Sequence, residues 1–116
     1  MRDDPKARQL FEEVFQKTSH GRIQWEATAE ENLFIAPIGG QFTLAVSHHR
    51  GGDRWGEEYD YVSLKLKDKE RELISVTSEV EDVPDIQLRE LYEIARRQAN
   101  KVDDKIDKVL NELGKL

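Results

Sequence analysis

The chain has 116 residues, 37% of them hydrophobic, which suits one domain with a single core. Its net charge of −6 argues against a general nucleic-acid binder, because an acidic surface repels polyanions. The chain has no cysteine, which excludes disulfide and thiolate chemistry. It also shows no apolar leader and no stretch of ~20 apolar residues that could span a bilayer. We therefore expect one cytoplasmic domain over residues 1–116.

An amphipathic helix is predicted for residues 5–18. Asp4 is placed to cap its first turn, and Pro5 suits the first helical position, where a missing N–H costs nothing. Gly21 suits the left-handed turn that commonly follows a helix. The face turned to the core is expected to consist of Ala7, Leu10, Phe11, Val14 and Phe15, which recur at three- and four-residue steps.

Alternation with a period of two begins at Arg22 and predicts five strands within residues 22–78. Gly39-Gly40 lies between two apolar runs and predicts a tight hairpin, since glycine adopts positive φ without a steric penalty. The other connections are short and polar, which favours an antiparallel meander over parallel strands joined by long crossovers. The predicted fold class is therefore α+β.

The last segment predicts one long helix over residues 86–113. At ~1.5 Å per residue it would measure about 40 Å, more than strands of ~6 residues can cover, so part of it should overhang the sheet. We expect a second copy of the chain to cover the overhang, although a bent helix covered by its own domain is the alternative. Apolar steps of four and three residues, typical of a helix packed lengthwise on another, give the candidate dimer seam: Tyr92, Ala95, Ala99, Val102, Ile106, Val109 and Leu113.

The stretch "HHRGGDRWGEEYDY", residues 48–61, is interpreted as a long hairpin connection. Gly51 and Gly56 have the spacing of a phosphate loop, but glutamates follow where Lys and Ser or Thr would be needed. His48 and His49 are adjacent and should point to opposite faces of a strand, so they cannot easily share a metal. We expect them to be solvent-exposed.

A hydrolase site would combine Ser47, one of the two histidines, and Asp53 or Asp60. These residue types are common in loops, and the chain has no G-x-S-x-G nucleophile elbow. No catalytic site is therefore predicted.

The same stretch also contains a candidate partner-binding surface, formed by Arg54, Trp55, Tyr59 and Tyr61. Aromatic and arginine side chains dominate the energetics of protein recognition. The alternative is that these aromatics pack on one another outside the sheet.

Arg96 and Arg97, together with Lys101, form a basic cluster in the last segment that would suit an acidic partner. Glu93 lies three and four residues before the two arginines, so a self-paired helix face is the favoured interpretation.

The chain resembles a group of small bacterial single-domain proteins with no assigned activity. The resemblance is carried by the order of elements, by "IQWEAT" at the first strand and by "LRELYEIARRQANKVDDKIDKVLNEL" in the last segment. The resemblance implies a bacterial cytoplasmic origin and the order helix, sheet, long helix. It implies no functional residue.

The sequence favours a non-enzymatic interaction module that dimerises through its last helix and needs no metal or cofactor. Residues 1–85 carry a formal charge of −7, so a partner of this part should be basic. A small-molecule site or minor enzyme at residues 48–61, and an immunity- or antitoxin-like inhibitor of a basic partner, remain the alternatives.

Overall fold

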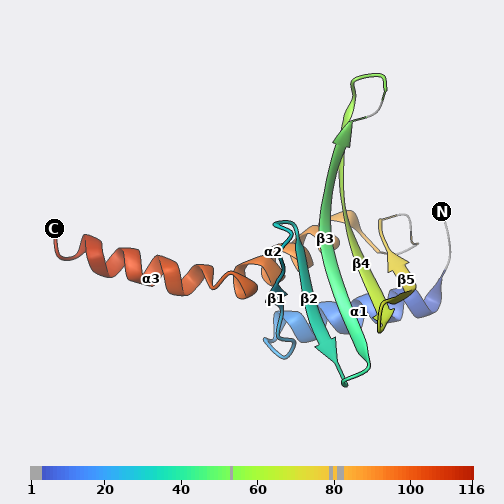
Figure 1. Cartoon of the computed structure of the whole chain (residues 1–116), viewed down its shortest axis with the longest axis horizontal. Coiled ribbons are helices and arrows are strands. Elements are labelled where there is room, and N and C mark those ends of the chain that lie inside the picture. Colours follow the sequence, from blue (N-terminus) through green and yellow to red (C-terminus); the bar gives the residue numbers. More distant parts are fainter. Residues whose placement is uncertain (1–3, 53, 79, 81–82) are drawn as a thin grey trace.

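The computed structural model describes residues 4–52, 54–78, 80 and 83–116. It contains an N-terminal helix, a five-stranded antiparallel sheet and two C-terminal helices, so the predicted α+β class is confirmed (Figure 1). The elements are α1 (Pro5–Ser19), β1 (Glu26–Ala27), β2 (Leu33–Ile38), β3 (Phe42–Gly52), β4 (Glu58–Asp68), β5 (Arg71–Val76), α2 (Asp85–Ala99) and α3 (Val102–Leu113).

The sheet is a meander in which each strand pairs with the next along the chain. The predicted β2–β3 hairpin is confirmed: Ile38 pairs with Phe42, and Gly39 and Gly40 have φ angles of 67° and 78°. Residues that pair directly across antiparallel strands share a face of the sheet. One face therefore presents Phe34, Val46, Leu64 and Val76 to α1 and α2, and together they form the core.

α1 follows its sequence signals closely. The Asp4 carboxylate accepts a hydrogen bond from the Ala7 N–H at 3.1 Å, and Pro5 opens the helix. Gly21 has a φ of 71° just after the helix, and the Arg22 N–H donates to the Lys17 carbonyl at 2.8 Å. These bonds satisfy backbone groups that a helix end leaves open.

The C-terminal segment is two helices rather than the single helix predicted over residues 86–113. Lys101 has left-handed backbone angles, φ 54° and ψ 44°, and separates α2 from α3. Asp103 and Asp104 in the first turn of α3 favour a new helix start, because carboxylates stabilise the positive end of the helix dipole. Arg97 spans the break with an ion pair to Asp103 at 2.5 Å.

The stretch over residues 48–61 is mostly strand, which corrects its interpretation as a hairpin connection. β3 and β4 have 11 residues each, and they remain paired from His48↔Val62 to Gly52↔Glu58. β2 pairs with β3 only as far as Ser47, and β5 pairs with β4 only as far as Leu64. Residues 48–52 and 58–62 therefore form a two-stranded ribbon, called here the β3–β4 ribbon.

Two elements project from the body of the protein in different directions, the β3–β4 ribbon and α3 (Figure 1). They explain a radius of gyration of 16.2 Å, compared with the ~13 Å expected for a compact domain of this length. None of the helices in the described part of the chain is long and apolar enough to cross a membrane.

Candidate functional site

The base of the β3–β4 ribbon is tied to α2 through Asp60. Arg89 Nη2 donates to the Asp60 carboxylate at 2.9 Å and to its carbonyl oxygen at 3.2 Å. The same guanidinium donates through Nε to Asp85 at 2.6 Å, across one helical turn. His48 Nε2 lies 3.2 Å from the other Asp60 oxygen. A two-stranded ribbon alone is marginally stable in water, so these contacts hold its base in place.

The electrostatics of this network favour the charged forms. Hydrogen bonds from Arg89, and then from His48, lower the pKa of the Asp60 carboxyl. Asp60 and Asp85 together raise the pKa of the Arg89 guanidinium. Both partners are partly exposed, so the network orients the ribbon more than it adds to overall stability.

His48 and His49 point to opposite faces of the sheet, as predicted. The His48 ring faces α2, with its centroid 5.4 Å from that of Tyr92. The His49 ring stacks on Tyr61 on the other face, at 4.6 Å and 20°. The expectation that both histidines are solvent-exposed was wrong, because the paired strands carry them into contact with neighbouring rings.

His49 also contacts two serine hydroxyls on the face of the sheet away from the helices. Its Nε2 lies 2.8 Å from Ser47 Oγ and 3.1 Å from Ser63 Oγ, and the two hydroxyls are 3.1 Å apart. Burial lowers the pKa of His49, and Lys65 acts in the same direction. Ser47 and Ser63 are only 8% and 1% exposed, so this cluster holds the imidazole rather than presenting a nucleophile.

The candidate partner-binding residues are distributed along the projecting hairpin. Arg54 and Trp55 lie together at its tip, where the Arg54 guanidinium is 5.2 Å from the Trp55 ring centroid and Trp55 is 77% exposed. Tyr61 lies three pairs below the end of the ladder, about 10 Å along the ribbon. Tyr59 pairs with Gly51, and its side chain is outside the described residues.

The residues of the candidate dimer seam have very different surroundings. Tyr92 and Ala95 are buried within the chain's own core, and Ala99 packs against that core. Val102, at the start of α3, is half-buried. The α2 part of the seam is therefore covered within the chain, whereas Ile106, Val109 and Leu113 of α3 are exposed.

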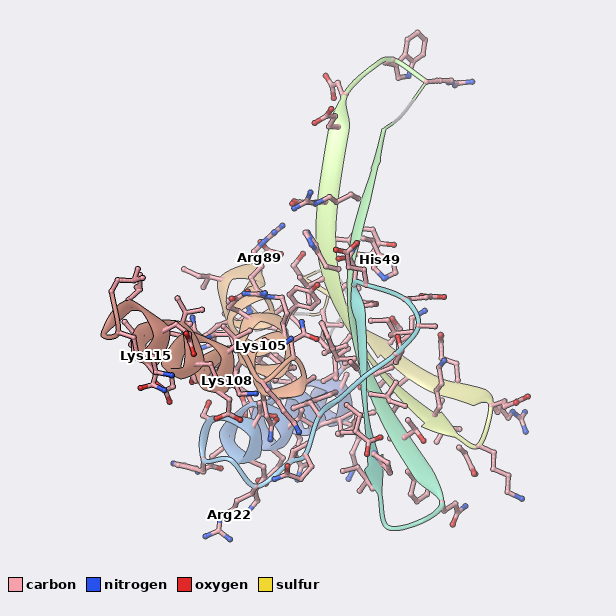
Figure 2. All side chains as sticks on the ribbon, turned by 60° about the vertical axis from the view of Figure 1, so that its left-hand side comes forward. Arg22, His49, Arg89, Lys105, Lys108 and Lys115 are labelled. Carbon is pink, nitrogen blue, oxygen red and sulfur yellow. The ribbon has the colours of Figure 1, made fainter. Side chains whose placement is uncertain are left out.

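α3 contains no buried residue and has a continuous apolar stripe. Leu110 and Leu116, which the heptad pattern does not include, border this stripe at 59% and 97% exposure. Lys105 and Lys108 lie along α3, and Lys115 lies just after its end (Figure 2). At ~100° per residue the apolar side chains of α3 fall within about a third of the circumference, and Leu116 follows three residues after the end of the helix. We call Ile106, Val109, Leu110, Leu113 and Leu116 the α3 apolar face.

The basic cluster of the last segment is largely self-paired, as favoured from the sequence. Arg96 Nε donates to Glu93 at 3.0 Å, and Arg97 pairs with Asp103 rather than with Glu93. This part of the surface gives little support to an acidic partner.

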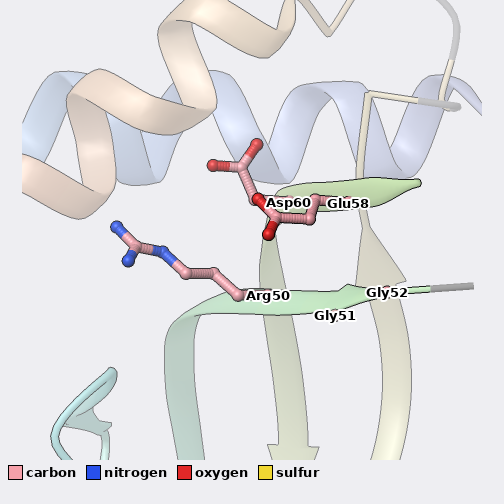
Figure 3. A pocket seen from close by; sticks show the side chains of 5 residues that line it. All are labelled: Arg50, Gly51, Gly52, Glu58 and Asp60. Carbon is pink, nitrogen blue, oxygen red and sulfur yellow. The ribbon is translucent and has the colours of Figure 1, made fainter. Parts of the chain in front are cut away.

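Arg50 lines two hollows at the inner side of the ribbon. The larger, of about 700 Å³, is acidic: Glu58 and Asp60 line it with Arg50, Gly51 and Gly52 (Figure 3). The smaller, of about 340 Å³, lies between the base of the ribbon and α2. Among the residues that the structure describes, no group of three or more histidines and carboxylates has an arrangement that would hold a metal ion.

Comparison with protein-family models, curated proteins and solved structures gave no significant match.

Proposed function

We propose that this protein is a non-enzymatic interaction module that self-associates through the α3 apolar face. The observation that carries the proposal is the exposure of that face, from 45% at Ile106 to 97% at Leu116. A contiguous apolar stripe of this kind is uncommon on a monomer and marks interaction sites.

A second copy is the occupant that fits best. It supplies the same apolar stripe, so the two faces match in length and in apolar character. The charged residues of α3 have both signs, so two copies do not repel one another through net charge. Asp107 and Lys108, for example, are neighbours outside the stripe.

The energetics favour a reversible assembly. The exposed fractions of the α3 apolar face correspond to about three fully exposed side chains per copy. Burying them in two copies contributes about 9–18 kcal/mol. Association costs about 4–15 kcal/mol, so the midpoints of the two ranges leave about 4 kcal/mol, which corresponds to a dissociation constant of about 1 mM.

We infer a second interaction site at the tip of the projecting hairpin, where a different protein would bind. Trp55 offers a large rigid side chain, and the Arg54 guanidinium lies against it. The acidity of residues 1–85 favours a basic partner. A dimer formed through α3 would carry two such tips.

Sedimentation equilibrium from about 50 μM to about 2 mM, which lies on both sides of a dissociation constant of about 1 mM, tests self-association. The wild type should shift from monomer to dimer. Val109→Asp should stay monomeric, because it places a charge within the α3 apolar face. Asn111→Asp adds the same charge on the opposite side of the same helix and should dimerise like the wild type.

A wild type that stays monomeric across the range would contradict the proposal. Equal behaviour of the two variants would mean that the contact lies elsewhere. Circular dichroism of both variants checks that α3 and the sheet remain folded.

A further inference from the structure

The smaller hollow beside the ribbon has the character of a binding pocket. Its volume of about 340 Å³ is at the lower end of the range for small-molecule sites. Four parts of the chain form its walls: the segment before β2, strands β3 and β4, and helix α2. The lining residues are Asn32, His48, Arg50, Val62, Arg89, Tyr92, Glu93 and Arg96.

The charge of this lining is opposite to that of the whole protein. Three arginines and one glutamate give it a formal charge of +2 with His48 neutral, in a chain of net charge −6. Distant acidic residues are screened at physiological salt, where the Debye length is ~8 Å. Nearby carboxylates offset the charge of Arg89 and Arg96, so the guanidinium of Arg50 is the main local positive charge that an anion would meet.

The three guanidinium groups differ in what already engages them. Arg89 is held by Asp60 and Asp85, and Arg96 is paired with Glu93. Arg50 forms no ion pair with any residue in the described part of the chain. The described residues leave its donors open to a ligand, and a guanidinium matches the oxygens of a carboxylate or phosphate.

The inner wall of the pocket is largely apolar. Val62 and Tyr92 are only 2% and 8% exposed, and the His48 ring lies beside that of Tyr92. The Tyr92 hydroxyl donates to Asn32 Oδ1 over a long 3.5 Å contact. A tyrosine hydroxyl is protonated at neutral pH, and burial raises the pKa of Tyr92 further. An anionic group at the arginines would have an aromatic surface behind it.

We propose that this pocket binds a small organic anion whose carboxylate or phosphate lies between Arg50 of the ribbon and Arg96 of α2, with its apolar part against Tyr92. Binding would add a second link between ribbon and helix, beside that through Asp60. The proposal does not depend on self-association through α3.

Titration of ¹⁵N-labelled protein with benzoate and with inorganic phosphate, at constant ionic strength, tests it by NMR. Saturable shifts should centre on the amides of Asn32, Val62 and Tyr92. Tighter binding of benzoate would identify a carboxylate with an apolar body as the ligand class, and tighter binding of phosphate would identify a phosphate.

Arg50→Ala should weaken the tighter probe about tenfold or more, because it removes a charge-assisted contact. Arg54→Ala removes the same charge from the tip of the same hairpin and should leave affinity unchanged. Arg50→Gln keeps a long polar side chain without the charge and should weaken binding as well. In each variant, an amide spectrum that is unchanged away from the pocket verifies the fold.

Shifts that rise linearly with both probes, or equal affinities in the Arg50→Ala and Arg54→Ala variants, would overturn the proposal. Val109→Asp should bind the probe like the wild type. Loss of anion binding and loss of self-association can therefore be distinguished.

Discussion

Replacing Lys101 by glycine tests the break between α2 and α3 through the sign of its effect on stability. Lys101 has a φ of 54°, a conformation that costs a residue with a side chain about 1–2 kcal/mol. Glycine avoids that cost but loses about 0.5–1 kcal/mol through the greater freedom of the unfolded chain. Lys101→Gly should therefore raise the free energy of unfolding by about 0.5–1 kcal/mol. In one continuous helix the same change would lower it by about 1 kcal/mol.

Urea unfolding followed by circular dichroism measures this difference. Glu90→Gly is the matched control, since Glu90 is an exposed charged residue inside α2, and it should lower stability by about 1 kcal/mol. If Lys101→Gly destabilises the protein as much as Glu90→Gly does, the left-handed residue and the break that it forms would be refuted.

Two further predictions concern the ribbon. Arg89→Ala should accelerate amide hydrogen exchange several-fold in residues 48–62, whereas Arg97→Ala should leave exchange there unchanged; equal effects would show that Asp60 does not depend on Arg89. The fold lowers the pKa of His49 below its ordinary value of 6.5, through burial first and then Lys65 and His48, with Glu30 opposing. The unfolded chain then binds more protons than the folded protein as the pH falls through 6.5. The free energy of unfolding should therefore decrease as the pH is lowered from about 7.5 to about 5.5. His49→Gln should reduce this decrease, and an unchanged slope would exclude a contribution from His49.

Local signals were sufficient to predict most of the fold. The cap at Asp4, the glycines at 39 and 40 and the two-residue alternation each act within a few residues, and the structure follows them. The break at Lys101 escaped prediction because apolar residues keep their spacing across a single residue of altered backbone. Leu110 and Leu116 were missed because a heptad template does not include them.

The candidate site was harder to predict because its residues are distant in sequence. Asn32, Arg50 and Arg96 meet only through the sheet and α2, and no sequence spacing indicates that. Gly51 and Gly52 are typical of turns, so they concealed the strand pairing of the ribbon. The four-residue spacing of Asp85 and Arg89 was visible and predicts an ion pair, but the contact of Arg89 with Asp60 depends on the tertiary fold.

The two tryptophans give the protein two separate optical reporters. Trp25 is 4% exposed and its indole donates to Thr18 Oγ1, so its fluorescence follows the melting of the core. Trp55, at the tip of the projecting hairpin, emits from water and responds to whatever contacts that tip. Trp55→Phe would leave a pure folding signal, and Trp25→Phe a signal for docking, so a partner can be sought by fluorescence without attaching a dye.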